Sequence, residues 1–331
     1  MAEKSFLEAE LEDLRTRCER VVEGSKLIAC VPQVVQVKIT RTSFKELTAH
    51  FQFGPDYPAS PLVIELKSKP LDFKLLQGLE KICHEEATKY LNKQQVIPLL
   101  QFIRKFIDEN PLCVCRGELA HIQQNLLQEG DTIKLKQKSS QIHLMVRGGP
   151  YFIKMCFTVP DYYPLEKLGV ECADHNFPEL FKQNFIGHCV EIARKSVEPP
   201  IRKNPKAPPF EPKPSLKAIA DFLFTDCVKR YYKEPCAACK AHALPPDPKD
   251  IVKEPRADNH IERVYCGHIY HHKCLDTYMK TPPFTGGKKC LSCSNRIYHE
   301  KWSITPEVAE ARWAHKQAKD RELDEVIDFL K

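Results

Sequence analysis

Hydrophobic positions in the first 110 residues follow two periods. Apolar side chains at 7, 11, 14 and 18 recur at helical spacing, whereas those at 35, 37 and 39 alternate as in a half-buried strand. The elements that this pattern predicts are a helix at 7–21, strands at 35–39, 47–53 and 62–66, and helices at 75–90 and 98–107. A turn, GPDYPASP, separates the second strand from the third. We therefore expect a mixed α+β domain.

The same order of elements then recurs. Its predicted elements are a helix at 116–129, strands at 131–137, 140–147, 151–159 and 168–172, and helices at 177–195 and 215–231. Aligning Tyr57-Pro58 with Tyr163-Pro164 also aligns Cys83 with Cys189 at a constant offset of 106 residues. This repetition indicates a duplicated domain. Residues 199–214 hold seven prolines in 16 positions, so they read as an extended insertion in the second copy.

Composition limits the class of protein. The 331 residues carry 50 basic and 44 acidic side chains, and 42% of them are hydrophobic, which is typical of an ordered globular chain with two or more domains. Like charges form no block and basic residues do not cluster with aromatic ones, so nucleic-acid binding is poorly supported. No run of 18 apolar residues predicts a membrane span, and the charged start of the chain is unlike a secretory signal. We expect a cytoplasmic or nuclear protein.

Six of the fifteen cysteines gather with histidines near the carboxyl end. The candidate ligands, in chain order, are Cys236, Cys239, Cys266, His268, His271, Cys274, Cys290 and Cys293. In a reducing compartment such a cluster indicates metal binding rather than disulfides. Eight thiolate and imidazole ligands suffice for two tetrahedral zinc ions. The short, polar region around these residues needs bound metal ions to stabilise its fold, because it has little apolar surface to bury.

This spacing resembles the RING-finger family, in the subtype with three Cys, two His and three Cys. The resemblance implies cross-braced coordination. One site would use Cys236, Cys239, His271 and Cys274, and the other would use Cys266, His268, Cys290 and Cys293. His272 is a competitor for His271, but the family spacing to the next cysteine favours His271. A PHD finger is the weaker interpretation, since it would carry Cys at position 268 and an aromatic residue shortly before the last pair.

RING fingers typically bind a charged ubiquitin-conjugating enzyme and position its ubiquitin for transfer, without a covalent intermediate. The resemblance therefore implies no catalytic nucleophile. Its contact groove carries over to Ala238, Leu275, Tyr278, Leu291 and Arg296. The alternative for Leu275, Tyr278 and Leu291 is that they pack the core of the small domain. Ser294 stands where the family often has its basic linchpin, and whether Arg296 takes that role stays open.

The helix–strand–helix order with a Tyr-Pro turn resembles the RWD family, non-catalytic relatives of ubiquitin-conjugating enzymes. Two such units before a RING resemble the architecture of the Fanconi anaemia ubiquitin ligase, without its extra N-terminal domain. Cys83 and Cys189 lie near where a conjugating enzyme keeps its nucleophile. No His-Pro-Asn stretch precedes them and both lie in apolar helical patterns, so we interpret them as core residues.

These observations predict an α+β chain with two tandem RWD-like domains, a cross-braced two-zinc RING and a C-terminal helix. The boundaries we expect are 1–111, 112–233, 234–300 and 301–331. The predicted function is that of a RING-type ubiquitin ligase, with a conjugating enzyme, ubiquitin and a protein substrate or adaptor as partners. The alternative is a non-catalytic, zinc-stabilised scaffold. For the final helix, with its stripe of Leu323, Val326, Ile327 and Leu330, we favour packing on a neighbouring domain over binding a partner.

Overall fold

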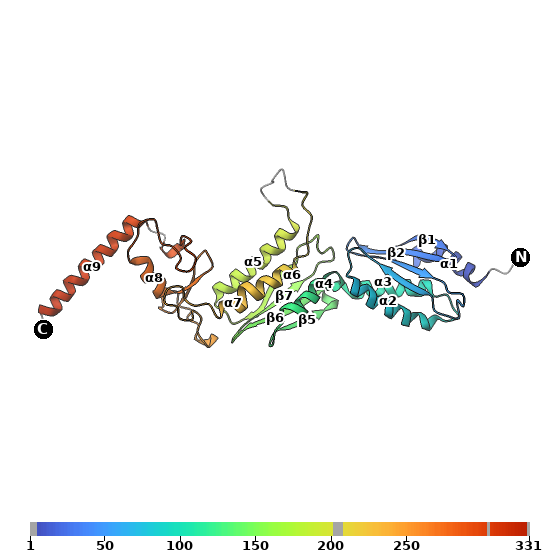
Figure 1. The fold of residues 1–331 in the computed structure, drawn as a ribbon, viewed down its shortest axis with the longest axis horizontal. Coiled ribbons are helices and arrows are strands. Elements are labelled where there is room, and N and C mark those ends of the chain that lie inside the picture. Colours follow the sequence, from blue (N-terminus) through green and yellow to red (C-terminus); the bar gives the residue numbers. More distant parts are fainter. Residues whose placement is uncertain (1–4, 201–207, 303–304, 330–331) are drawn as a thin grey trace. The chain divides into compact units, whose positions relative to one another are not determined.

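The computed structural model describes residues 5–200, 208–302 and 305–329, and it divides into two compact units (Figure 1). Unit 1 comprises residues 1–145, 154–173 and 186–222, and unit 2 comprises residues 146–153, 174–185 and 223–331. Residues 201–207 of the proline-rich insertion lie outside the described residues, as does Leu330. Within the described ranges, every helix is too short or too polar to cross a membrane.

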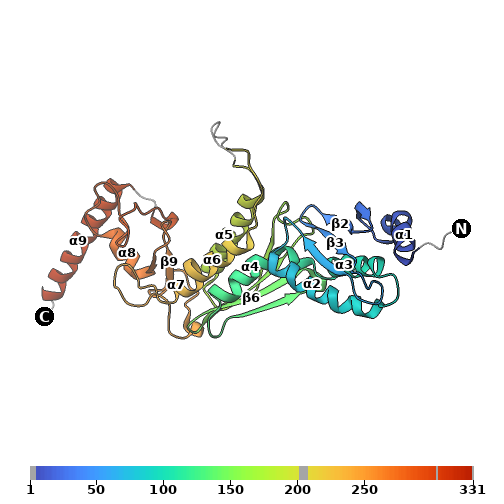
Figure 2. The ribbon, with the colours of Figure 1, turned by 45° about the vertical axis from the view of Figure 1, so that its right-hand side comes forward.

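Unit 1 begins with a helix, a four-stranded antiparallel sheet and two further helices. Their bounds are α1 (Phe6–Val21), β1 (Ser25–Val31), β2 (Val34–Thr42), β3 (Lys45–Gln52), β4 (Val63–Lys67), α2 (Phe73–Ala87) and α3 (Val96–Glu109). The strand order is β1-β2-β3-β4. Figures 1 and 2 show α2 and α3 running beside one another along one side of this sheet.

Sequence patterning accounts for this packing. Val35, Val37 and Ile39 of β2 are fully buried, while the residues between them are only half-buried. Burying one such side chain contributes roughly 1.5–3 kcal/mol. Ser5 and Glu8 form a reciprocal capping box at the start of α1, which satisfies two backbone N–H groups. The side chain of Asp72 caps α2 in the same position.

The sequence pattern missed strand β1, so the expectation of three strands is wrong and the sheet has four. The register of β1 with β2 shifts between Leu27 and Ala29, which marks a bulge. On this edge strand Ile28 is 54% exposed and both of its neighbours are half-buried. Residues 27–31 are apolar at every position, so the sequence lacks the alternation of polar and apolar residues on which a strand prediction depends.

A second four-stranded sheet has the order β5-β6-β7-β8. Its elements are α4 (Arg116–His121), β5 (Thr132–Lys136), β6 (Gln141–Gly148), β7 (Tyr151–Thr158), β8 (Gly169–His175), α5 (Glu179–Val197), α6 (Leu216–Asp221) and α7 (Lys229–Tyr231). Helix α4 continues as a π-helical segment to Leu126, three residues short of the expected end. A π-helical segment, Phe222–Val228, joins α6 to α7, so the helix expected at 215–231 is continuous but irregular.

The two Tyr-Pro turns share one arrangement within unit 1, and both peptide bonds before these prolines are cis. Tyr57 donates its hydroxyl to Glu10, whose carboxylate accepts from the backbone N–H of Gln95 and Val96 at 2.9 and 3.0 Å. That carboxylate thus caps α3, where an anion is favourable.

In the second turn the phenol and the carboxylate share the cap, and Glu118 accepts from the backbone N–H of Lys217 at 2.9 Å. Tyr163 donates to Glu118 at 2.9 Å and accepts from the backbone N–H of Ser215 and Leu216, at the start of α6, at 2.6 and 3.1 Å. Burial raises the pKa of both tyrosines, Tyr57 and Tyr163, so each stays a hydroxyl donor.

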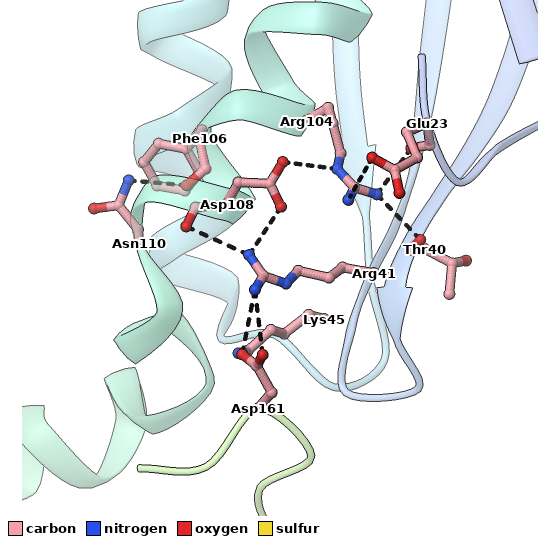
Figure 3. Close-up of polar contacts among 9 residues, drawn as sticks. All are labelled: Glu23, Thr40, Arg41, Lys45, Arg104, Phe106, Asp108, Asn110 and Asp161. Carbon is pink, nitrogen blue, oxygen red and sulfur yellow. Dashed lines mark hydrogen bonds and ion pairs between the residues drawn. The ribbon is translucent and has the colours of Figure 1, made fainter. Parts of the chain in front are cut away.

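Charged groups surround the loop that leads into the second Tyr-Pro turn (Figure 3). Asp161 accepts from Lys45 at 2.9 Å and from Arg41 at 3.3 Å, and Arg41 also donates to Asp108 at 2.9 Å. Lys45 is 1% exposed, so Asp161 neutralises a buried cation. The Lys45 hydrogen bond is the main cause that lowers the pKa of Asp161.

The part of unit 2 that follows α7 includes a small hairpin and the helices α8 and α9. Their bounds are β9 (Ile261–Arg263), β10 (Ile269–His271), α8 (His272–Lys280) and α9 (Pro306–Phe329). In the same unit, Phe181 and Phe185 stack around Tyr231 at 4.8 and 5.7 Å between ring centroids. Along α9, Ala309 is buried but Leu323 and Ile327 are exposed, so the expected stripe is not packed at these two positions. The side chain of Val326 lies outside the described residues.

Candidate metal centres

Two C-x2-C turns in unit 2 adopt the same backbone geometry. The backbone N–H of Lys240 donates to the carbonyl of Cys236 at 2.9 Å, and that of Ser294 donates to the carbonyl of Cys290 at 2.8 Å. Lys240 and Ser294 each follow the second cysteine of their pair and hold left-handed φ angles of 64° and 61°. Each turn therefore folds back on itself and directs two thiols to one side.

Each turn is closed by a further backbone contact. The N–H of Cys236 donates to the carbonyl of Ala241, and the N–H of Cys290 donates to that of Asn295, both at 2.7 Å. A short bridge flanks each turn, Pro235 with His242 and Lys289 with Arg296. The two pairs of thiols are thus held by backbone hydrogen bonds of the same pattern.

The other four candidate ligands lie on the β9–β10 hairpin and the first turn of α8. Cys266 and His268 flank Gly267, whose φ of 92° suits glycine at this tight turn. The N–H of Gly267 donates to the carbonyl of Val264 at 2.8 Å. His271 ends β10 and precedes α8, and Cys274 lies in the first turn of that helix.

These eight residues gather into two groups of four. Cys236, Cys239, His271 and Cys274 form the first group, and Cys266, His268, Cys290 and Cys293 form the second. Within each group the ligand atoms lie within 4.8 Å of one another. Among the described residues, these are the two sets that a cross-braced arrangement requires.

The spacing inside each group suits zinc. Zn–S bonds of about 2.3 Å and Zn–N bonds of about 2.1 Å place sulfur and nitrogen about 3.5 Å apart in a tetrahedral site. His271 Nδ1 lies 3.4 Å from Cys239 Sγ and 3.9 Å from Cys274 Sγ. His268 Nδ1 lies 3.4 Å from Cys266 Sγ. Each group can therefore hold one metal ion, and a set of three thiols and one imidazole fits zinc.

His272, the expected competitor of His271, is engaged elsewhere. Its Nδ1 lies 2.9 Å from a carboxylate oxygen of Glu262, which also contacts His299 and Lys301. Burial works to raise the pKa of Glu262, but the hydrogen bonds from His299, Lys301 and His272 outweigh it and lower the pKa to about 2. Glu262 therefore stays ionised and ties the segment after the last ligand to the hairpin.

Supporting groups that the sequence analysis did not identify surround the second group of ligands. Tyr270 is fully buried, donates its hydroxyl to Cys290 Sγ at 3.2 Å, and accepts from the N–H of Leu291 at 3.1 Å. Such partners orient a thiolate ligand. Only its place between His268 and His271 in an apolar strand could have indicated Tyr270 from sequence.

The expected conjugating-enzyme contacts lie in different environments. Leu275 is fully buried, so in this structure it packs the core of the zinc-binding region, the second of the two alternatives for this residue. Ala238 is half-buried, and Tyr278 donates to the carbonyl of Lys289 at 2.8 Å. Leu291 is 47% exposed and Arg296 is exposed, so neither packs in a core.

The two cysteines weighed as nucleophiles are core residues. Cys83 and Cys189 are fully buried. Burial, with Glu80 and Glu86 adding to it at Cys83, raises the pKa of each thiol to about 12. Neither thiol is ionised near neutral pH, which a nucleophile requires.

Comparison with known proteins covers the first part of the chain. No curated protein matches this chain. The RWD domain family model matches residues 3–107, the segment that contains α1, the first sheet, α2 and most of α3. Residues 3–107 are thus an RWD domain, as the sequence pattern indicated.

Proposed function

We propose that this protein is a RING-type ubiquitin ligase whose zinc-binding region recruits a ubiquitin-conjugating enzyme. The observation that carries the proposal is the interleaving of the ligands. Along the chain, the first and third ligand pairs, on the turn at 236–239 and at the junction of β10 and α8, form one group. The hairpin turn and the last C-x2-C form the other. This order is what the resemblance to RING fingers implies, and it is combined with an RWD domain at residues 3–107.

The second sheet supports a second RWD-like domain. Its strand order, its cis Tyr-Pro bond and the bond from Tyr163 to Glu118 parallel the first sheet and the bond from Tyr57 to Glu10. In this proposal the tandem pair presents a protein substrate or an adaptor, because neither Cys83 nor Cys189 can act as a nucleophile.

Transfer in such a ligase depends on positioning, so this chain contributes surfaces rather than a reactive group. Bound zinc would hold the two C-x2-C turns in place. Leu291 stands out from the second turn, and Arg296 lies two residues beyond Ser294 with its guanidinium 5.4 Å from the ring of Tyr298. We assign these two exposed side chains to the conjugating enzyme and its ubiquitin.

The experiment is autoubiquitination with a panel of conjugating enzymes. We expect activity from the wild type, none from Cys236→Ala/Cys239→Ala, and at least about tenfold less from Leu291→Ala/Arg296→Ala, since hot-spot truncations each cost more than about 1 kcal/mol. The Leu291/Arg296 variant should keep its zinc. Lys253→Ala, at an exposed position between Cys239 and Cys266, is the matched control and should remain active.

A non-catalytic scaffold is the second candidate. It is favoured by the burial of Leu275 and by Ser294, whose left-handed backbone occupies the position where RING fingers often carry a basic residue. The scaffold function would be supported if the wild type binds two zinc ions per chain but shows no more autoubiquitination than the cysteine variant with any conjugating enzyme.

A further inference from the structure

A groove of about 970 Å³ lies between the zinc-binding region and the first half of α9 in unit 2. Ile297, Trp302 and Ala309 line its buried parts, and Trp313 and the exposed Tyr298 extend it toward solvent. The groove thus offers an apolar surface of a size that suits one face of a helix.

Basic side chains surround this groove. Arg312 and Lys316 line it, both are exposed, and neither forms an ion pair within the part of the chain that the structure describes. The acidic residue in the lining, Asp276, is already bound by Lys280 at 2.8 Å and by the indole of Trp302 at 2.9 Å. The groove therefore favours an acidic occupant.

The second half of α9 has the complementary character. Leu323 and Ile327 are spaced one helical turn apart and are 59% and 42% exposed. By sequence, residues 320–331 carry five acidic and two basic side chains. An exposed apolar pair on an acidic helix is the chemistry that the groove would accept.

Groove-lining residues of α9 and the exposed pair Leu323 and Ile327 lie on one face of the helix. Ala309, Trp313, Lys316, Asp320, Leu323 and Ile327 are separated alternately by four and three residues. This spacing keeps them on one face of α9, as in paired helices. The 24 residues of α9 extend about 36 Å, enough for both halves to make contacts at once.

We propose that two copies of this chain associate through antiparallel α9 helices, the second half of each lying in the groove of the other. A two-fold axis near Asp320 places Ile327 of one copy level with Trp313 of the other. By position in the sequence, Asp324 and Asp328 then come level with Lys316 and Arg312 of the other copy. Lys319 and Arg321 flank the two Asp320 side chains at the axis.

A second copy of the chain would cover more of the exposed apolar and charged surface than the other possible occupants of the groove. An acidic peptide or a single-stranded nucleic acid would satisfy the cations, but it would leave Leu323 and Ile327 exposed. A two-fold pair covers the groove and the stripe together, and does so twice, which is the property of a self-complementary surface. The pairing does not depend on ligase activity.

The first test is the mass of the zinc-loaded full chain by analytical ultracentrifugation at micromolar concentrations. We expect a dimer, and at least about 100-fold weaker association for Leu323→Asp/Ile327→Asp, because the loss of two buried aliphatic side chains costs several kcal/mol. Zinc content and helical circular dichroism check that the variant is folded. A wild type that is monomeric throughout this range overturns the proposal.

The second test exchanges charges. Arg312→Glu/Lys316→Glu and Asp324→Lys/Asp328→Lys should each be monomeric alone, because each homodimer would oppose like charges. An equimolar mixture of the two should recover the dimer mass. Lys69→Glu/Lys74→Glu, at exposed positions in unit 1, makes the same change in net charge and should stay dimeric. A mixture that stays monomeric, or a control that dissociates equally, contradicts the antiparallel arrangement.

Discussion

The two Tyr-Pro turns predict unequal costs for the same substitution. Tyr57→Phe removes the hydrogen bond to Glu10 and a longer one, at 3.4 Å, from the N–H of Gln95, but the Glu10 carboxylate still caps the N–H groups of Gln95 and Val96. Tyr163→Phe removes the bond to Glu118 and also the acceptor of two buried N–H groups at the start of α6. The second substitution should therefore destabilise the chain more.

The magnitudes follow from the contacts. A hydrogen bond to a charged group is worth about 1.5–3 kcal/mol, and a buried donor left without an acceptor costs about 1–3 kcal/mol. We expect a loss of about 1.5–2 kcal/mol for Tyr57→Phe and of about 3–4 kcal/mol for Tyr163→Phe. The difference of about 2 kcal/mol corresponds to roughly a 30-fold change in the local opening constant.

Amide hydrogen exchange measures the loss of stability at each helix start separately. A local measurement is needed because a chain with several domains need not unfold in one step. The readouts are the amides at the starts of α3 and α6 in the two variants. Tyr162→Phe is the matched control, because Tyr162 is 52% exposed, and its protection should match that of the wild type. Equal losses in the two turns, or a larger loss for Tyr57→Phe, would refute the assignment of the phenol as part of the cap of α6.

Three further predictions concern metal, backbone and charge. Elemental analysis should give two zinc ions per chain, and chelation should open residues 234–300 to proteolysis while residues 3–107 stay protected. Ser294→Gly should be neutral or stabilise by up to about 1 kcal/mol, whereas Ser294→Val should cost about 1–2 kcal/mol in denaturation with zinc present, because of the left-handed φ. The pKa of Asp161 is lowered on folding, so its stabilising effect is present above its unfolded pKa of about 3.9 and is lost as the pH falls through the folded value. Asp161→Asn should thus destabilise by about 1–2 kcal/mol at pH 7, and the difference from wild type should vanish at strongly acidic pH.

Periodicity predicted the elements with a regular buried face. Strands β2 and β3 and helices α1 and α2 of the RWD domain, and the helix at 216–231, follow from apolar positions that repeat regularly. Strand β1 was missed because residues 27–31 are all apolar, so polar and apolar positions do not alternate there. Helix α9 was predicted, but its exposed Leu323 and Ile327 were expected to be packed. An amphipathic pattern indicates that a face can be buried, but it does not say what covers it.

At the candidate metal centres, spacing predicted which Cys and His residues gather into two groups of four, because a shared zinc ion would constrain which of them converge. It did not predict the groups that hold those ligands. Tyr270 reaches Cys290 across 20 residues, and Glu262 joins His272, His299 and Lys301, which are far apart in the chain. Such partners depend on tertiary packing, and a single sequence gives no periodic signal for them.

The short hairpin strand β10 couples the two metal centres. His268 belongs to one group and His271 to the other, with only Ile269 and Tyr270 between them. Release of either ion would free one end of this strand and loosen the ligand at its other end. Occupancy should therefore be cooperative, so that under metal scarcity chains hold either both ions or neither, and singly loaded chains stay rare.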